Sequence, residues 1–431
     1  MELFKKTARS NDMLRVLGIR SFFFMMVSEF FSQFAFSMQH FVLIFIVYET
    51  TKSSTAVSGI VLSFTIPALL FSLISGVYVD RWNKKKVLFY TNLIRGFLIL
   101  PFLIPNLHIS VIYLLTFLIA VATQFFLPAH ASVIPNLVPK KHLLAANAVF
   151  SFGIYGTTLL GYILSGPIVL LIGKANAFIL LAVLFFISSF FVIFINLPKK
   201  KKSIVDGLNI FPAKVSLAGE AKEIFIFIRK ARKVFHALMM MTIAQSVIFM
   251  FAVLAPGYMT KILNTQIESL SLILIAPAAV GMGLSSILLG SVGKHFRHKW
   301  LSGIGFLLGG AVFILFPFGN RVISNELIQT INSFLPHILT ITLLHIVIVM
   351  AFVMGFAISF VFIPSNTTIQ IETSDAMRGR VYGLVNAIIG AVSFLPVIMA
   401  GGLADLFGIP RVVIGFGIIM IGLGIFFWLF E

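Results

Sequence analysis

Glu29 is a carboxylic acid inside a long apolar stretch, and it shares one predicted helical face with other side chains able to handle protons. With a turn of about 100° per residue, Gln33 lies about 40° and His40 about 20° around the helix from Glu29, and Phe36 falls on the same stripe. An ionisable group among apolar residues is unfavourable unless it is paired or hydrated. We therefore expect Glu29 to carry an exchangeable proton, with Gln33 orienting its carboxyl group through an i,i+4 hydrogen bond.

Two simpler explanations of this stripe stay open. Glu29 could remain a neutral carboxylic acid whose role is to hydrogen-bond Gln33, and His40 could serve packing near one end of its helix. The sequence alone does not choose between proton exchange and packing.

The composition identifies the elements that must position these groups. Of the 431 residues, 59% are hydrophobic and 11% are charged, and the mean hydropathy is +1.06. Twelve membrane-spanning helices of about 20 residues would use nearly all of this apolar content. The composition excludes a soluble globular enzyme, a disordered chain and a coiled coil. It also argues against a membrane β-barrel, in which apolar and polar residues alternate.

Apolar runs separated by polar breaks predict an all-α polytopic membrane protein with twelve transmembrane helices. We expect these at 20–47, 54–79, 87–106, 109–134, 143–172, 175–197, 237–263, 267–292, 300–318, 338–366, 381–403 and 407–430.

The basic residues are concentrated in alternate connections between the predicted spans, and these connections hold most of the 32 Lys and Arg residues. The positive-inside rule therefore predicts a multi-pass inner (plasma) membrane protein with both termini in the cytoplasm. The net charge of +18 then indicates contact with anionic lipid headgroups and not with nucleic acid. The chain has no cysteine, which excludes disulfides and Cys-ligated metal centres, and we expect no metal and no cofactor.

One long polar interruption divides the chain into two sets of six spans. We expect a cytoplasmic N-terminus at 1–19, a six-helix bundle at 20–197, a linker at 198–236 and a second six-helix bundle at 237–431. Basic clusters and an apolar run at 219–236 predict that the linker includes a helix lying at the membrane surface. Similar motifs recur in both halves, as in Phe126-Leu-Pro-Ala and Phe362-Ile-Pro-Ser, which indicates an internal duplication with pseudo-symmetry.

The end of the second span and the turn after it carry Gly76-Val-Tyr-Val-Asp80-Arg81-Trp-Asn-Lys84-Lys85-Lys86. This pattern resembles the cytoplasmic gate motif of the major facilitator superfamily, at the position where that family has it. The resemblance implies the major facilitator fold, alternating access, and a latch in which Asp80 faces donors of the other half.

Two further stretches resemble the bacterial branch that contains macrolide-efflux proteins and the enterobactin exporter. They are Pro128-Ala-His-Ala-Ser-Val-Ile-Pro and the turn Met377-Arg378-Gly-Arg380-Val381, whose arginines we assign to the gate. The resemblance implies a secondary transporter and not an enzyme. Its most favoured activity is proton-coupled efflux of a hydrophobic or amphipathic, drug-like molecule, with resistance to that drug as the result.

The family fold places spans 1, 4, 5, 7, 10 and 11 around a central cavity, so polar and aromatic residues on those spans become candidate substrate contacts. Besides Glu29, these candidates are Gln33, Phe36, His40, Gln124, Asn147, Ser151, Tyr155, Gln245, His345 and Asn386. Arg95 lies on a peripheral span, where we expect it to pair internally or to reach the membrane surface.

Other functions remain possible within the same fold. A lysolipid, siderophore or nutrient transporter, with or without proton coupling, would have the same composition. A lipid-modifying membrane enzyme is a remote alternative, because the sequence lacks clustered acidic or metal-binding motifs. We expect a monomer that binds a small-molecule substrate and protons.

Overall fold

The structure of the chain is a computed structural model that describes residues 12–139, 142–197, 231–292, 298–317, 342–373 and 375–430. Within these residues the regular elements are all helices, with no strand. The all-α class predicted from composition is therefore confirmed.

Eight helical elements build the described residues of the first half. They are α2 (Asp12–Leu17), α3 (Arg20–Thr51), α4 (Ser54–Arg81), α5 (Lys84–Ile99), a 3₁₀ turn η1 (Leu100–Leu103), α6 (Ile109–Leu137), α7 (Leu143–Ile172) and α8 (Lys174–Ile193).

The described second half begins with α10 (Arg232–Lys261), followed by a 3₁₀ turn η4 (Ile267–Ser269) and a π-helical segment η5 (Ser271–Ile275). The segment η5 runs directly into α11 (Ala276–Val292), and the remaining helices are α12 (His298–Leu315), α14 (Leu343–Glu372), α15 (Asp375–Phe407) and α16 (Ile409–Phe430).

Each of the twelve predicted spans coincides with one of these helices. Eleven of the described helices are long and apolar enough to cross a membrane, and α12 has a shorter apolar part at Lys299–Leu315. The predicted ends are wrong at several places. The tenth span was placed at 338–366, whereas α14 occupies Leu343–Glu372, and the eleventh was placed at 381–403, whereas α15 occupies Asp375–Phe407.

The linker prediction falls mostly outside the described residues, because the structure describes nothing between 198 and 230. Its last residues, from Arg232 onward, belong to α10. The predicted surface helix at 219–236 therefore overlaps the start of a spanning helix.

Tight connections join several neighbouring helices. Gly173 links α7 to α8 and Gly408 links α15 to α16, with φ of 79° and 84°, a left-handed conformation that glycine adopts without strain. Connections this short force the joined helices to run antiparallel.

Internal contacts divide the chain into two compact units. Among the described residues, unit 1 comprises α2, α3 up to His40, α4 from Ser63, α5, α6, α7 up to Tyr162, and α8. Unit 2 comprises the remaining parts of α3, α4 and α7 together with every element from α10 to α16. The division thus passes through the three helices α3, α4 and α7.

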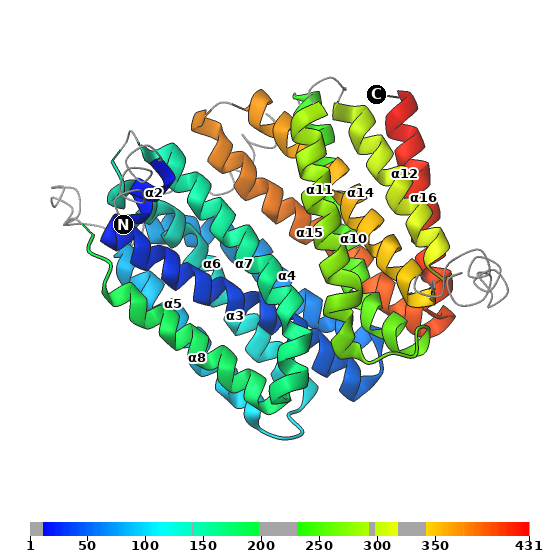
Figure 1. Cartoon of the computed structure of the whole chain (residues 1–431), viewed down its shortest axis with the longest axis horizontal. Helices are drawn as coiled ribbons and strands as arrows, with labels where there is room; N and C mark the ends of the chain where they lie inside the picture. Colours follow the sequence, from blue (N-terminus) through cyan, green and yellow to red (C-terminus); the bar gives the residue numbers. More distant parts are fainter. Residues whose placement is uncertain are drawn as a thin grey trace, which may run out of the picture. The chain divides into compact units, whose positions relative to one another are not determined.

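Unit 1 is held by small residues and aromatic packing. Ser28 of α3 and Ser188 of α8 exchange hydrogen bonds, each hydroxyl donating to the other residue's carbonyl oxygen at 3.0 and 2.7 Å. The helix α5 lies alongside α8 and α6 (Figure 1). The Cβ of an alanine at Gly96 would overlap the ring of Phe186, so α5 and α8 approach closely.

Unit 2 contains a glycine seam between α12 and α16, which run side by side (Figure 1). A Cβ at Gly310 would lie 2.7 Å from the carbonyl oxygen of Gly417, and a Cβ at Gly417 would lie 2.8 Å from that of Gly310. Close backbone approach of this kind drives helix association in a bilayer, where burial of apolar surface contributes little.

The ends of α3 and α7 join unit 2 through equally close contacts. Thr260 of α10 donates a hydrogen bond to the hydroxyl of Tyr48 on α3 at 3.2 Å. Gly166 of α7 lies against the backbone carbonyl of Glu268 in η4, with no room for a Cβ. These contacts explain why the division between the units cuts across the helices.

Candidate functional site

The centre of unit 1 holds an acid–base pair that joins α3 to α6. The carboxylate Oε2 of Glu29 lies 3.1 Å from Nε2 of His130, and both side chains are 2% exposed. The His130 ring stacks on Phe150 with a centroid distance of 4.9 Å and a tilt of 14°, and it also contacts Phe126. The helices therefore hold the imidazole in a fixed orientation beside the carboxylate.

Arg95 of α5 is buried next to this pair. Its guanidinium donates to Ser32 Oγ at 2.9 Å and to Asn92 Oδ1 at 2.5 Å, and Ser32 Oγ donates in turn to Asn92 Oδ1 at 3.1 Å. The same group lies between two rings, 4.4 Å from the centroid of Phe126 and 4.8 Å from that of Phe185. Arg95 thus pairs internally, as one of the two sequence expectations stated.

The buried groups have a simple charge balance. Glu29 interacts electrostatically with both Arg95 and His130. With an ionised carboxylate, a charged guanidinium and a neutral imidazole, their net charge is zero. A proton added to either Glu29 or His130 leaves one uncompensated positive charge, which is costly in a buried, low-dielectric site. We call Glu29, His130 and Arg95 the acid–base cluster.

The remaining residues of the predicted α3 stripe contact α7 and α4. Gln33 Nε2 donates to Thr158 Oγ1 of α7 at 2.9 Å, and His40 Nδ1 lies 3.1 Å from the hydroxyl of Tyr162. The His40 ring packs against Phe36 and against Phe64 of α4, with centroid distances of 4.2 and 3.8 Å. The structure therefore pairs Gln33 with α7 and gives Glu29 a different partner, His130.

The predicted α7 stripe is largely exposed. Asn147 and Ser151 are exposed, and Tyr155 is 71% exposed. Gln124 of α6 and Gln245 of α10 are half-buried.

In unit 2, Ser246 of α10 and Ser393 of α15 share a hydrogen bond of 2.8 Å. His345 lies in the first turn of α14, where its Nδ1 accepts from the backbone N–H of Thr342 at 3.1 Å and forms a capping box. The sequence placed His345 well inside a span, but the later start of α14 puts it at the helix end. The side chain of Asn386 lies outside the described part of the structure.

The gate motif is described only in part. Backbone helix continues through Gly76, Asp80 and Arg81, whose surroundings lie outside the described residues, as do those of Arg378 and Arg380. The lysines that follow the motif begin α5. Lys85 Nζ donates to the carbonyl oxygen of Ile193 at 2.6 Å, which ties the start of α5 to the end of α8.

A second polar arrangement, in unit 2, joins α15 to the start of α4. Asp405 accepts from Ser53 Oγ at 2.6 Å and from the backbone N–H groups of Ser54 and Thr55, each at 2.9 Å. The carboxylate thus satisfies the free N–H groups of the first turn of α4, as an N-cap residue would. About one turn further along α4, Ser58 Oγ donates to the carbonyl oxygen of Val397 at 2.7 Å.

The same place has no room for a larger side chain on α15. A Cβ at Gly401 would lie 2.6 Å from the carbonyl oxygen of Ser54 and would overlap Ser58 Oγ, whereas a Cβ at Gly402 would meet nothing within 4 Å. We call this set of interactions between Ser53–Ser58 and Val397–Asp405 the α4–α15 contact.

Sequence reasoning missed His130 and Asp405. His130 lies inside a predicted span, so the criterion that selected Glu29, an ionisable group among apolar residues, would have found it. Asp405 fell just beyond the predicted end of its span at 403 and therefore read as a loop residue.

We compared the chain with known proteins, and several resemble it over most of its length. An uncharacterized MFS-type transporter of Bacillus subtilis strain 168, YfiS, is 23% identical over 386 residues, covering 87% of this chain and 85% of that protein. Macrolide efflux protein A of Streptococcus pyogenes is 24% identical over 375 residues, covering 85% of each. The crystal structure of the nucleoside transporter NupG superposes with a TM-score of 0.68 at 14% identity, covering 95% of this chain and 100% of that one.

These likenesses extend over nearly the whole chain. The sequence pattern of the Major Facilitator Superfamily matches residues 25–395, which include both the acid–base cluster and the gate motif. The arrangement of apolar helices agrees with that match. The chain therefore belongs to the Major Facilitator Superfamily.

Proposed function

We propose that this protein is a secondary active transporter that works by alternating access and exports a hydrophobic or amphipathic small molecule in exchange for protons. The observation that carries the proposal is the 3.1 Å contact between Glu29 and His130, buried in a membrane-spanning unit beside Arg95. Buried ionisable groups in spanning helices mark ion or substrate pathways.

The charge balance of the acid–base cluster supplies the coupling. Without the added proton, the cluster has no net charge and can therefore stay buried away from water. Protonation leaves one excess positive charge, which favours a conformation that lets water reach the cluster. Proton binding thus changes the relative free energy of two conformations, which is what an alternating-access cycle requires.

The substrate class rests on homology and on side chains of α3 and α7 in unit 1. One relative that covers most of this chain is a macrolide efflux protein. Phe36 and the exposed Tyr155 provide aromatic surface, and Gln33 and Ser151 provide polar contacts for an amphipathic molecule. Large adaptable sites for drug-like molecules have this mixture of side chains.

The orientation follows from the basic residues. The turn containing Lys84 and Lys85 faces the cytoplasm of a bacterial inner membrane, as do both termini. On the family motif, we assign Asp80, Arg81, Arg378 and Arg380 to the cytoplasmic gate. The α4–α15 contact involves the other end of α4, which this orientation places on the outer side.

The test uses proteoliposomes that contain the purified protein and a labelled macrolide. Glu29→Gln keeps the size and hydrogen-bonding capacity of the side chain but cannot titrate. We expect this variant to lose efflux driven by a pH gradient while retaining measurable substrate exchange at zero gradient. Glu372→Gln is the matched control, because Glu372 forms an exposed ion pair with Lys233 at 2.7 Å and should keep both activities.

Full retention of pH-driven efflux by Glu29→Gln would contradict proton coupling through this residue. Loss of both activities, with folding intact, would instead make Glu29 a substrate contact or a structural group. Absence of macrolide transport by the unmodified protein would contradict the proposed substrate class, and a thermal-shift screen of antibiotics, siderophores and lysolipids would then identify another.

A further inference from the structure

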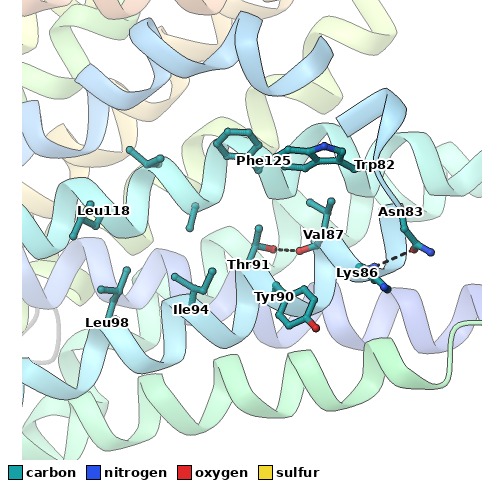
Figure 2. A pocket seen from close by; sticks show the side chains of 12 residues that line it. Trp82, Asn83, Lys86, Val87, Tyr90, Thr91, Ile94, Leu98, Leu118 and Phe125 are labelled. Atoms are coloured by element: carbon teal, nitrogen blue, oxygen red, sulfur yellow. Dashed lines mark hydrogen bonds between the residues drawn. The ribbon is translucent and has the colours of Figure 1, made fainter. Parts of the chain in front are cut away.

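A groove of about 690 Å³ runs along unit 1 between α5 and α6 (Figure 2). It lies on the side of α5 that carries the exposed residues Tyr90 and Ile94, whereas Asn92 and Arg95 of the same helix are buried in the core. Its lining consists of Trp82, Asn83, Lys86, Val87, Tyr90, Thr91, Ile94, Leu98, Leu118, Val121, Ala122 and Phe125.

The groove is apolar along most of its length. From Lys86 to Leu98 the helix α5 advances about 18 Å at 1.5 Å per residue. One leaflet of a bilayer has a hydrocarbon depth of about 15 Å, half of the full core. The apolar part, with Ile94, Leu98 and Leu118 along it (Figure 2), therefore has the length of one lipid acyl chain.

One end of the groove is polar and basic. Trp82 is 49% exposed and stacks on Phe125 with a centroid distance of 5.9 Å and a tilt of 15°. Asn83 Oδ1 accepts from the backbone N–H of Lys86 at 3.2 Å, which leaves the amide nitrogen of Asn83 free to donate elsewhere. Tryptophan and tyrosine are enriched where hydrocarbon meets headgroups, so this end lies at the membrane surface.

Lys86 differs from its neighbour in what its amine can bind. Lys85 Nζ is engaged by the Ile193 carbonyl oxygen, whereas Lys86 is exposed and lines the groove. An ammonium group at the end of an apolar groove complements a negatively charged headgroup and disfavours a cationic amphiphile.

We propose that this groove binds one anionic phospholipid. The phosphate lies at Lys86 and Asn83, and one acyl chain follows the apolar stripe from Tyr90 to Leu98 against α6. This site goes beyond the proposed transport function, because it faces the lipid and shares no residue with the acid–base cluster or the predicted substrate contacts.

The experiment uses the fluorescence of Trp82, which lies at the polar end of the groove. Trp300→Phe and Trp428→Phe leave Trp82 as the sole tryptophan of the three in the chain. This variant is placed in vesicles of unlabelled phosphatidylcholine. In one series an increasing fraction of the lipid is phosphatidylglycerol with brominated acyl chains, and in the other it is phosphatidylcholine with brominated acyl chains. Bromine quenches tryptophan fluorescence at short range, so the quenching curve gives the relative affinity for each lipid.

We expect about a fivefold preference for phosphatidylglycerol, the ratio that corresponds to the ~1 kcal/mol contributed by one lysine near a membrane surface. Lys86→Ala should reduce this preference to near unity. Lys84→Ala is the matched control, because it removes the same charge two residues away at a position that does not line the groove, and it should keep most of the preference.

A second variant tests the apolar part independently. Ala122→Phe fills the groove from α6 and should remove the preference while leaving the lysines in place. Three results would overturn the proposal: equal quenching by both lipids in the parent protein, equal losses in Lys84→Ala and Lys86→Ala, or an unchanged preference in Ala122→Phe. The second result would indicate a general surface potential without a site.

Discussion

Asp405 near the end of α15 caps the helix that begins at Ser54, a residue 351 positions earlier in the chain. The carboxylate reaches two backbone N–H groups and one hydroxyl of the first turn of α4. A capping interaction is normally made by a residue next to its own helix, and here it joins helices from the two halves of the sequence. An alternating-access transporter that opens at this end has to break it.

The first prediction concerns Asp405→Asn. Loss of the negative charge should weaken the cap by roughly 1 kcal/mol and favour opening about fivefold. The chain has no cysteine, so Ser58→Cys, buried at the α4–α15 contact, provides a unique thiol reporter. We expect faster thiol labelling in membranes when Asp405→Asn is added to Ser58→Cys. An unchanged labelling rate would show that the cap does not limit opening.

The second prediction uses two adjacent glycines. An alanine at Gly401 would press against the Ser54 carbonyl oxygen, which cannot move aside as a flexible side chain can. Gly401→Ala should therefore separate α4 from α15 and lower the transport rate. Gly402→Ala adds the same methyl group in open space and should leave transport near that of the unmodified protein. Equal effects of the two substitutions would mean that helix flexibility, and not close approach, matters at this position.

The third prediction treats Glu29 and His130 as one proton-binding unit. Glu29→Gln and His130→Asn should each strongly reduce pH-driven efflux, and the double variant should be no worse than the more severe single variant. Groups that act together give such non-additive effects. Initial rates of macrolide efflux from proteoliposomes under a fixed pH gradient measure this. Multiplication of the two single effects would show that the residues act independently.

The fourth prediction concerns Arg95. Arg95→Met removes the positive charge that interacts with the buried Glu29 carboxylate. It also removes the guanidinium donor to Ser32 and one of the two donors to Asn92 Oδ1. Breaking a buried charge pair typically costs about 3–5 kcal/mol, so the melting temperature in detergent should fall sharply. Combining Arg95→Met with Glu29→Gln removes both charges and should recover part of that loss. A double variant no more stable than Arg95→Met would indicate that the lost packing between Phe126 and Phe185 dominates.

The fifth prediction tests the proposed cytoplasmic gate. Asp80→Asn should leave expression and folding largely intact but reduce turnover, because the latch would no longer stabilise the state closed toward the cytoplasm. The shift in conformational free energy should be a few kcal/mol at most. Thiol labelling from the cytoplasmic side, combined with transport assays, provides the measurement. Unchanged accessibility together with unchanged transport would remove Asp80 from the gate.

The approximate position of the described helices could be predicted because each span is a long apolar run bounded by a polar break. Their ends were less predictable. The π-helical segment Ser271–Ile275 contacts α11 and α14, and such contacts leave no local pattern in the sequence. The start of α14 is set by a local capping box between Thr342 and His345, which hydropathy alone does not reveal. This is why His345 was expected in the cavity and is found in a capping box.

Of the acid–base cluster, the sequence identified Glu29 but not its partner His130, and the physical reason is different. Helical periodicity shows which residues share a face with Glu29, but not which helix packs against that face. Gln33 was the partner available from spacing along α3, whereas the observed partner, His130, comes from α6, 101 residues later. Only the packing of three helices brings Glu29, His130 and Arg95 together.

The position of Arg95 between two phenylalanine rings has an electrical consequence. A guanidinium keeps its charge at any physiological pH, and its aromatic and hydrogen-bonding partners fix it in α5. If the Glu29–His130 pair gains and loses one proton in each cycle, exchange for an uncharged substrate moves one net charge across the membrane. A membrane potential of 100 mV then contributes about 2.3 kcal/mol to each turnover. Such a protein would extract work from voltage as well as from the pH difference, and a potassium diffusion potential imposed across vesicles would accelerate export at equal pH on both sides.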